Sequence, residues 1–159
     1  MLLGRGVREI AYLGGLPDLS TSRNRYKGYC RALREAGLPH DPRLVLQQDY
    51  SPAHCYAMIR LLDERLGRLP EALFTSAYTL LEGVLQFLKE RSGGIPASLH
   101  IATFDDHPLL DYLPARIVSV KQDCAAMARN AFVLFLASVQ KRHTRARHIR
   151  VNPKLIDRS

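Results

Sequence analysis

The sequence lacks the features that mark most secreted, disulfide-stabilised or membrane-spanning proteins. Its three cysteines, Cys30, Cys55 and Cys124, are far apart and form no CxxC pair, so neither a disulfide framework nor a metal site is expected. No apolar run approaches the roughly 18 residues that a membrane span needs. The first residues, MLLGRGVREI, have no long apolar region of the kind found in signal peptides. We therefore expect a cytoplasmic protein with no membrane contact.

Motifs that would indicate catalysis are also absent. The sequence contains no GxSxG nucleophile turn, no HExxH metal motif and no Walker-type phosphate loop. The adjacent carboxylates Asp105 and Asp106 are candidates for a metal or acid-base site, but neighbouring residues on a strand point to opposite faces. We expect one of them to face a ligand and the other to cap a helix, and we expect no enzymatic activity.

Excess positive charge is confined to the end of the chain. The formal net charge is +8, and residues 141–159 carry seven basic residues against one acidic residue. The preceding 140 residues hold 16 basic and 14 acidic residues and are therefore nearly neutral. Because no aromatic or recognition-helix pattern accompanies the basic segment, a solvated tail is favoured over a phosphate-binding arm.

Short apolar runs alternate with amphipathic stretches along most of the chain. Strands are predicted at 8–14, 43–49, 71–76, 98–106, 116–122 and, as an edge strand, 148–158. Helices are predicted at 22–36, 51–67, 78–94 and 123–140, with a helical turn at 107–113. This alternation is typical of an α/β fold in which helices flank a central, mostly parallel sheet. A chain of 159 residues with 47% hydrophobic composition fits one ordinary domain.

The helix predicted at 123–140 is apolar on nearly all sides. Such a helix is stable in water only when most of its surface is covered. No later predicted helix is available to cover it, so we expect its neighbours to lie in another lobe or another subunit. We also expect the isolated chain to self-associate.

Polar residues gather where the predicted parallel strands end. Ligands of such sheets bind outside the C-terminal strand ends, where loops lead into helices. The stretch STSRNRYKGY follows the first strand, and DYS and FDD follow the second and the fourth. A helix start offers free N–H groups and the positive end of the helix dipole, and Arg23 or Arg25 would add a bidentate clamp. The residues alone predict a site for an anion or a sugar.

Four segments resemble one known protein family, in the same order along the chain. They are LGGLPDLSTSRNRYKGY, LPEALFTSAYTLLEGV, IPASLHIATFDDHPLLDYL and VSVKQD. Together they are similar to the sugar-responsive region of the LacI/GalR family of bacterial transcription regulators, and within it to the fructose-repressor subgroup. The resemblance covers essentially the whole chain and implies a lobe with the type I periplasmic-binding-protein fold.

The resemblance also implies a domain organisation. Residues 1–115 correspond to the C-terminal lobe of the sugar-binding region, residues 116–140 to a crossover strand and helix of the other lobe, and residues 141–159 to the return and the basic tail. The helix-turn-helix headpiece and most of the N-terminal lobe are expected to be absent, so DNA contact belongs to the headpiece alone. The family dimerises through this lobe, which implies a homodimer or tetramer with HPLLDYL at the interface.

The matching motifs imply a set of effector-binding residues. Arg25 matches the arginine that holds the effector, and Thr21 matches a contact one helical turn earlier. Tyr50 resembles the aromatic residue that lies against the sugar ring, with a packing role as the open alternative. Asp105 resembles a carboxylate that accepts bonds from sugar hydroxyls, and Gln122 the polar residue ending the crossover strand. The full set is Thr21, Ser22, Arg25, Tyr50, Ser76, Asp105 and Gln122.

Two positions depart from the pattern of this subgroup. Asp105 stands where a glycine is expected in some fructose repressors, and because a carboxylate repels phosphate we expect it to face hydroxyls. Ala77 stands where other family members carry a polar contact. The effector implied for the subgroup is fructose 1-phosphate, with fructose 1,6-bisphosphate as the weaker candidate, and no cofactor is implied.

Three functions follow from these expectations. The leading one is the effector-binding part of a DNA-binding repressor or activator of fructose and central carbon metabolism. The second is a small flavodoxin-like or sugar-processing α/β enzyme, for which the sequence offers no nucleophile, base or dinucleotide motif. The third is a dimerisation domain without a ligand. A response to a sugar phosphate that depends on Arg25 separates the first from the third, and turnover of that ligand would support the second.

Overall fold

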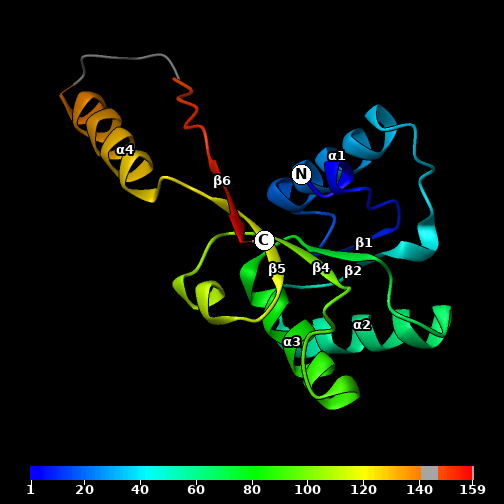
Figure 1. Cartoon of the computed structure of the whole chain (residues 1–159). Coiled ribbons are helices and arrows are strands. Elements are labelled where there is room, and N and C mark those ends of the chain that lie inside the picture. Colours follow the sequence, from blue (N-terminus) through cyan, green and yellow to red (C-terminus); the bar gives the residue numbers. More distant parts are fainter. Residues whose placement is uncertain (141–146, 159) are drawn as a thin grey trace.

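One six-stranded sheet organises the chain (Figure 1). The computed structural model describes residues 1–140 and 147–158. The strands are β1 (Ile10–Gly14), β2 (Val45–Gln47), β3 (Ala72–Thr75), β4 (His100–Phe104), β5 (Arg116–Lys121) and β6 (Lys154–Arg158). The helices are α1 (Ser20–Glu35), α2 (Pro52–Leu66), α3 (Tyr78–Ser92) and α4 (Cys124–Val139), with 3₁₀ turns η1 (Leu3–Arg5), η2 (Pro42–Leu44) and η3 (Pro108–Tyr112). The predicted α/β class is confirmed.

The strand order is β2-β1-β3-β4-β5-β6. Neighbouring strands from β2 to β5 run parallel, whereas β6 runs antiparallel to β5. The parallel strands stay in step, since Ile10 lies opposite Ala72, Ala72 opposite His100, and His100 opposite Arg116. Their C-terminal ends therefore share one edge of the sheet, and the loops after β1 to β5 meet there.

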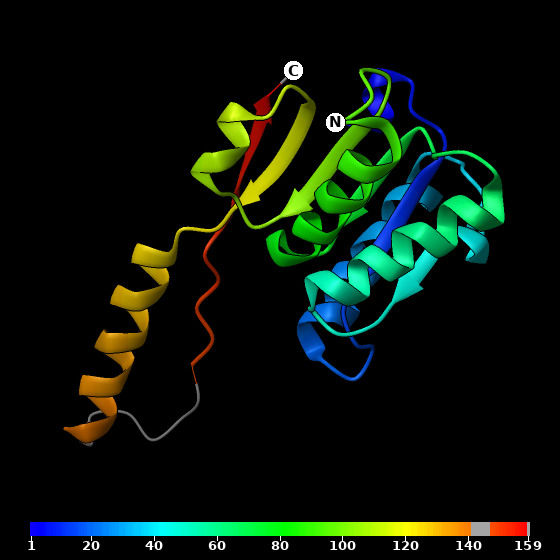
Figure 2. The same cartoon turned by 90° about the horizontal axis from the view of Figure 1, so that it is seen from below.

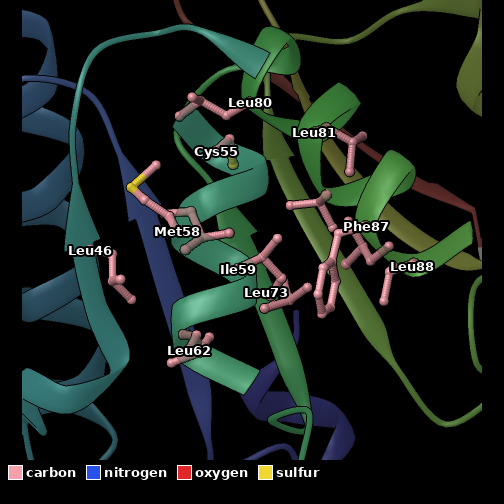
Figure 3. Packing of buried hydrophobic residues seen from close by; sticks show 14 of the residues in the cluster. Leu46, Cys55, Met58, Ile59, Leu62, Leu73, Leu80, Leu81, Phe87 and Leu88 are labelled. Atoms are coloured by element: carbon pink, nitrogen blue, oxygen red, sulfur yellow. The ribbon is translucent and has the colours of Figure 1, made fainter. Parts of the chain in front are cut away.

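Both faces of the sheet are buried at its central strands β1 and β3. In β1, Ala11 and Leu13 belong to the core under α2 and α3, whereas Ile10 and Tyr12 belong to the core under α1. Helices α2 and α3 lie side by side on one face and α1 covers the other (Figures 1 and 2). The larger core is filled by leucine, isoleucine, methionine and phenylalanine side chains (Figure 3). Burial on both faces explains why these strands read as nearly continuous apolar runs.

The sequence analysis assigned residues 116–140 to the other lobe, but β5, which begins at residue 116, is part of the same sheet. Strand β5 lies inside the same sheet, between β4 and β6, and its residues Ile117, Val118 and Ser119 are buried. The part of the chain that leaves the sheet therefore begins after Lys121. Helix α4 projects away from the sheet and its flanking helices (Figures 1 and 2). Whether α4 belongs to a second lobe stays a prediction.

The end of the chain returns to the sheet. Strand β6 begins directly after Pro153, as expected for an edge strand. The prediction of a solvated tail is wrong for Arg158. Its guanidinium pairs with Asp106 at 2.9 Å and with Asp111 at 2.5 Å. The basic residues Lys141, Arg142 and Arg145 lie outside the described residues.

The turn HPLLDYL is divided between core and surface. Leu110 in η3 is buried and joins the larger core. Leu109 and Tyr112 are exposed, by 56% and 82%, so they are available to the interface that the sequence predicts here. No helix in the described part of the chain combines the length and apolar character that crossing a membrane requires.

Helix α4 leads to a prediction about association. None of its residues is buried, and Phe132, Val133, Phe135 and Val139 are each more than 60% exposed. Monomers rarely expose several large apolar side chains on one helix. We therefore expect the chain to self-associate, with a sedimentation coefficient that rises with protein concentration. The double substitution Phe132→Glu and Phe135→Glu should reduce this rise, whereas Ser138→Glu, which adds charge at a polar position of the same helix, should change it less. A wild-type monomer at several hundred micromolar protein would contradict the prediction.

Candidate functional site

The candidate site lies at the C-terminal edge of the parallel strands. The loop after β1 leads into α1, and the loops after β4 and β5 follow strands that lie two and three places along the sheet from β1. Helix α1 begins at Ser20, two residues earlier than predicted, with Leu19 as an extended N-cap that makes no side-chain capping bond. The first-turn N–H groups of α1 therefore receive no hydrogen bond from a capping side chain, which leaves this helix end suited to an anion.

Arg25 extends from the second turn of α1 across the ends of β3 and β4. Its Nη1 donates a hydrogen bond of 2.6 Å to the backbone oxygen of Ser76, after β3. Its guanidinium carbon lies 3.9 Å from the ring centroid of Phe104, the last residue of β4. A carbonyl on one side and an aromatic face on the other hold the guanidinium in place. Arg25 is half-buried, so part of the group still faces outward.

Arg23, the alternative clamp, is used differently. Its Nη1 donates to the backbone oxygen of Asp18 at 2.6 Å and more weakly to that of Pro17 at 3.4 Å. Arg23 therefore ties the start of α1 to the loop before it. The structure thus distinguishes the two arginines of the STSRNRYKGY stretch, of which only Arg25 crosses the sheet edge.

A hollow of about 720 Å³ joins three of the predicted residues. Thr21, Arg25 and Gln122 line it together with Asn24 and Phe104. Thr21 is exposed on the first turn of α1, so its hydroxyl is accessible from the hollow. The hollow continues over the α1 face of the sheet, where its apolar lining includes Phe74, Ala102, Val118 and Leu155. Its polar end can bind hydroxyl or phosphate groups, and its apolar part cannot.

Asp105 adopts an unusual backbone conformation. Its φ of 73° makes it the only residue other than glycine with a positive φ among the described residues. Aspartate tolerates this left-handed region better than most residues, but glycine would be favoured there. The carboxylate accepts a 2.6 Å hydrogen bond from Nε2 of Gln122. Because Gln122 lines the hollow and Asp105 does not, the pair places a carboxylate directly behind an amide at its edge.

Tyr50 is joined to α1 from the loop after β2. Its hydroxyl lies 2.7 Å from Oγ of Ser22. Gly15 makes this approach possible, because a Cβ atom at Gly15 would collide with the Tyr50 ring and stand 2.8 Å from Oγ of Ser22. The sequence analysis did not single out Gly15, although a glycine pair directly after a strand is a recognisable sign of close packing. Tyr50 does not line the hollow.

Ser22 and Ser76 differ from the other predicted contacts. Both are completely buried. The hydroxyl of Ser22 pairs with Tyr50, and Oγ of Ser76 accepts a 3.3 Å bond from the backbone N–H of Gly15. In this conformation neither side chain has exposed surface with which to touch an effector. The structure gives them a supporting role, in which they hold Tyr50 and the loop after β1.

Asp106 is not the helix cap that the sequence predicted. His107 caps η3 instead, by accepting the N–H of Leu109 at 3.2 Å. Asp106 accepts a 2.6 Å bond from Oγ of Ser119 and pairs with Arg158. Burial alone would raise the pKa of Asp106, but these partners outweigh burial and lower it. Asp106 therefore joins β4, β5 and β6, while Asp105 faces Gln122. The described residues include no group of three or more histidine, cysteine or acidic side chains placed to hold a metal.

The sheet topology and the polar edge together define a lobe of the periplasmic-binding-protein type. Residues 1–159 match the family of periplasmic binding protein-like domains. The chain is 42% identical over 126 residues to the sucrose operon repressor of Klebsiella pneumoniae, covering 79% of this chain and 37% of that protein. It is 36% identical over 140 residues to the catabolite repressor/activator of Salmonella typhimurium, covering 85% and 40%.

A solved structure gives the same result for the fold. The Cra transcriptional dual regulator from Pseudomonas putida, in complex with fructose 1-phosphate, matches 99% of this chain and 57% of its own with a TM-score of 0.85 and 30% identity. The chain belongs to the periplasmic binding protein-like domain family, and its homologues are transcription regulators of the LacI family rather than enzymes. It spans 37% to 40% of the length of the two repressors compared above.

Proposed function

We propose that this chain binds a fructose phosphate, with fructose 1-phosphate as the leading effector, as the sensing lobe of a transcription regulator. The observation that carries the proposal is the position of Arg25, held between the Ser76 carbonyl and the Phe104 ring at the edge of the hollow. A guanidinium already fixed in place loses little conformational freedom when it binds a phosphate. The Pseudomonas putida Cra complex with fructose 1-phosphate supports this choice of ligand class.

The two ends of the site suit different parts of such a ligand. Arg25 and the first turn of α1 present positive charge and free N–H groups, which favours the phosphate. At the other end, the Gln122 amide can form hydrogen bonds with hydroxyl groups. The Asp105 carboxylate behind it would repel a phosphate. We assign the phosphate to the Arg25 end and the sugar hydroxyls to the Gln122 end. A second phosphate would fall near Asp105, so fructose 1,6-bisphosphate is the weaker candidate.

The regulatory role follows from the class of protein. In the complete regulator, effector binding shifts the population between two conformations that differ in affinity for DNA. We assign DNA contact to a headpiece rather than to this lobe, and we propose a homodimer or tetramer in the cytoplasm as the working form. The regulated genes are proposed to serve fructose and central carbon metabolism, in line with the relatives named as catabolite and fructose operon regulators.

A neutral sugar is the second candidate effector. The Asp105 carboxylate beside Gln122 favours uncharged hydroxyl groups, and the sucrose operon repressor is 42% identical to this chain. Sucrose contains a fructose ring, so the same hydroxyl-binding end serves both candidates. They differ in whether Arg25 meets a phosphate.

A ligand panel tests the proposed function. Thermal unfolding is measured with fructose 1-phosphate, fructose 1,6-bisphosphate, fructose, sucrose and, as a phosphate-bearing control, glucose 6-phosphate. Fructose 1-phosphate is expected to raise the midpoint saturably, because a ligand at 100 times its dissociation constant stabilises a protein by about 2.7 kcal/mol. A larger shift with fructose or sucrose would support the neutral-sugar alternative. Equal shifts with all phosphates would show a nonspecific anion site and refute the assigned effector.

Asp105 provides a separate prediction about selectivity. Asp105→Asn keeps the side-chain shape and the tolerance for a left-handed backbone but removes the charge. We expect it to raise the affinity for fructose 1,6-bisphosphate relative to fructose 1-phosphate by about three- to tenfold, as expected when one nearby like charge is removed. Asp105→Ala is expected to unfold more easily by about 1 kcal/mol than the asparagine variant, since alanine resists a φ of 73°. An unchanged affinity ratio would place Asp105 away from the phosphate.

A further inference from the structure

Tyr12 lies in the middle of β1 and has no exposed surface. Its ring packs at a tilt against Tyr26, with centroids 5.3 Å apart, and against Tyr29 at 5.1 Å, and it meets the Phe74 ring edge-on at 5.6 Å. A phenylalanine ring would make all of these contacts equally well. The packing of β1 against α1 therefore does not explain the hydroxyl.

The Tyr12 side chain leans along β1 toward the candidate site. A Cβ atom at Gly14, two residues further along the same face, would stand 2.9 Å from Cζ and 3.0 Å from the hydroxyl oxygen of Tyr12. Ser76 extends β3 beside this position, since its N–H donates to the Leu13 carbonyl at 2.9 Å. Phe74 and Ser76 are two residues apart and so share the face that Tyr12 occupies. The Tyr12 hydroxyl therefore points toward the residues that hold Arg25.

The hydroxyl of Tyr12 is buried without a hydrogen-bond partner among the described residues. Tyr29, in the same aromatic cluster, differs because its hydroxyl donates a 2.9 Å bond to the Ile10 carbonyl. Burial raises the pKa of Tyr12 to about 12, while a side-chain contact with Ser76 lowers it by less. The hydroxyl is therefore a neutral donor that already lies near the Ser76 side chain without forming a regular hydrogen bond to it. An unpaired buried hydroxyl destabilises the conformation in which it occurs. A bond formed in another conformation would offset this penalty.

We propose that Tyr12 is a positioning residue of the effector site, whose hydroxyl donates to Oγ of Ser76 when the effector is bound. The inference rests on the proposed function. The backbone oxygen of Ser76 is bonded to Arg25 at 2.6 Å, so a small adjustment of the guanidinium on binding a phosphate would be passed directly to Ser76. Oγ of Ser76 accepts only a long bond of 3.3 Å from Gly15 and has capacity for a second donor. The new bond would hold Ser76, and through it Arg25, in the ligand-bound position.

Tyr12→Phe tests this inference, with Tyr29→Phe as the matched control. In the full chain without ligand, Tyr12→Phe is expected to raise the thermal midpoint by about 2–4 °C, because it removes an unpaired polar group. The dissociation constant for fructose 1-phosphate, measured by calorimetry, is expected to increase about three- to tenfold, the range for one lost hydrogen bond. Tyr29→Phe is expected to do the opposite, lowering the midpoint while leaving the affinity unchanged.

A double-mutant cycle identifies the proposed acceptor. If Tyr12 donates to Ser76 in the bound state, Tyr12→Phe should weaken binding much less in a Ser76→Ala background. Full additivity, a lower thermal midpoint for Tyr12→Phe, or an unchanged affinity would each overturn the inference while leaving the proposed function intact. Absence of any saturable response of the wild-type chain to the sugar panel would instead refute the proposed function and, with it, this role for Tyr12.

Discussion

Replacing Arg25 by alanine is expected to weaken the binding of fructose 1-phosphate about 100-fold, the effect of losing a charge-assisted, bidentate contact. The same change removes the 2.6 Å bond to the Ser76 carbonyl and the stacking on Phe104, so it should also lower the free energy of unfolding by about 1–2 kcal/mol. Calorimetric titration and chemical denaturation measure the two effects separately. Binding should fall much more than stability.

Two further variants show whether the effect belongs to this guanidinium. Arg25→Lys keeps the charge but loses the planar fork, so an intermediate affinity is expected. Arg23→Ala is the matched control, because Arg23 lies two residues away on the same helix and bonds only to the preceding loop. It should leave the affinity within about twofold, as expected for an exposed charge outside the site. Equal losses for Arg23→Ala and Arg25→Ala would mean that general positive charge, and not Arg25, attracts the ligand.

Gly83→Ala is expected to destabilise the fold by about 3 kcal/mol or more. Helices α2 and α3 are packed tightly against each other at this glycine. A Cβ atom there would collide with the Pro52 carbonyl oxygen and stand 2.8 Å from the Tyr56 nitrogen and 3.0 Å from Cβ of Cys55. Since two of these are backbone atoms, neither can move aside without shifting α2. The thermal midpoint should fall by about 10 °C.

Gly28 is the matched control for this prediction. It also lies within a helix, but a Cβ atom at Gly28 meets nothing within 4 Å. Gly28→Ala should therefore stabilise the protein by about 0.5–1 kcal/mol, because alanine favours the helix. The two glycine substitutions thus have opposite expected signs. A Gly83→Ala variant as stable as Gly28→Ala would show that the α2–α3 contact is not as close as described.

The alternation of apolar runs predicted the order of strands and helices because both cores select apolar residues at regular spacing. Boundaries were less predictable where a side chain competes locally. Residues 43–49 were expected to form one strand, but Asp41 caps the 3₁₀ turn η2 by accepting the N–H of Arg43 at 2.8 Å. Strand β2 therefore begins only at Val45. Such a turn competes with a strand through one local hydrogen bond, which apolar spacing does not record.

The candidate site was predictable in its location and less so in its details. The position of Arg25, Thr21 and Gln122 at one edge follows from the parallel order of the strands. The burial of Ser22 does not, because it depends on the approach of Tyr50 from a loop 28 residues away. The roles of Asp105 and Asp106 were predicted from the rule that neighbouring residues on a strand point to opposite faces. The left-handed backbone of Asp105 means that this rule does not apply there. Contacts between separate loops and unusual backbone angles require the tertiary structure.

The most direct test of the fructose phosphate site is an NMR titration of the uniformly ¹⁵N-labelled chain with fructose 1-phosphate, which also detects weak binding. Binding at the proposed site should give saturable shifts of the backbone amide signals of Thr21, Arg25, Asp105 and Gln122, all with one dissociation constant, and glucose 6-phosphate should give none. Saturable shifts confined to other regions, or no shifts at millimolar ligand, would contradict the assignment of this sheet edge as a fructose phosphate site.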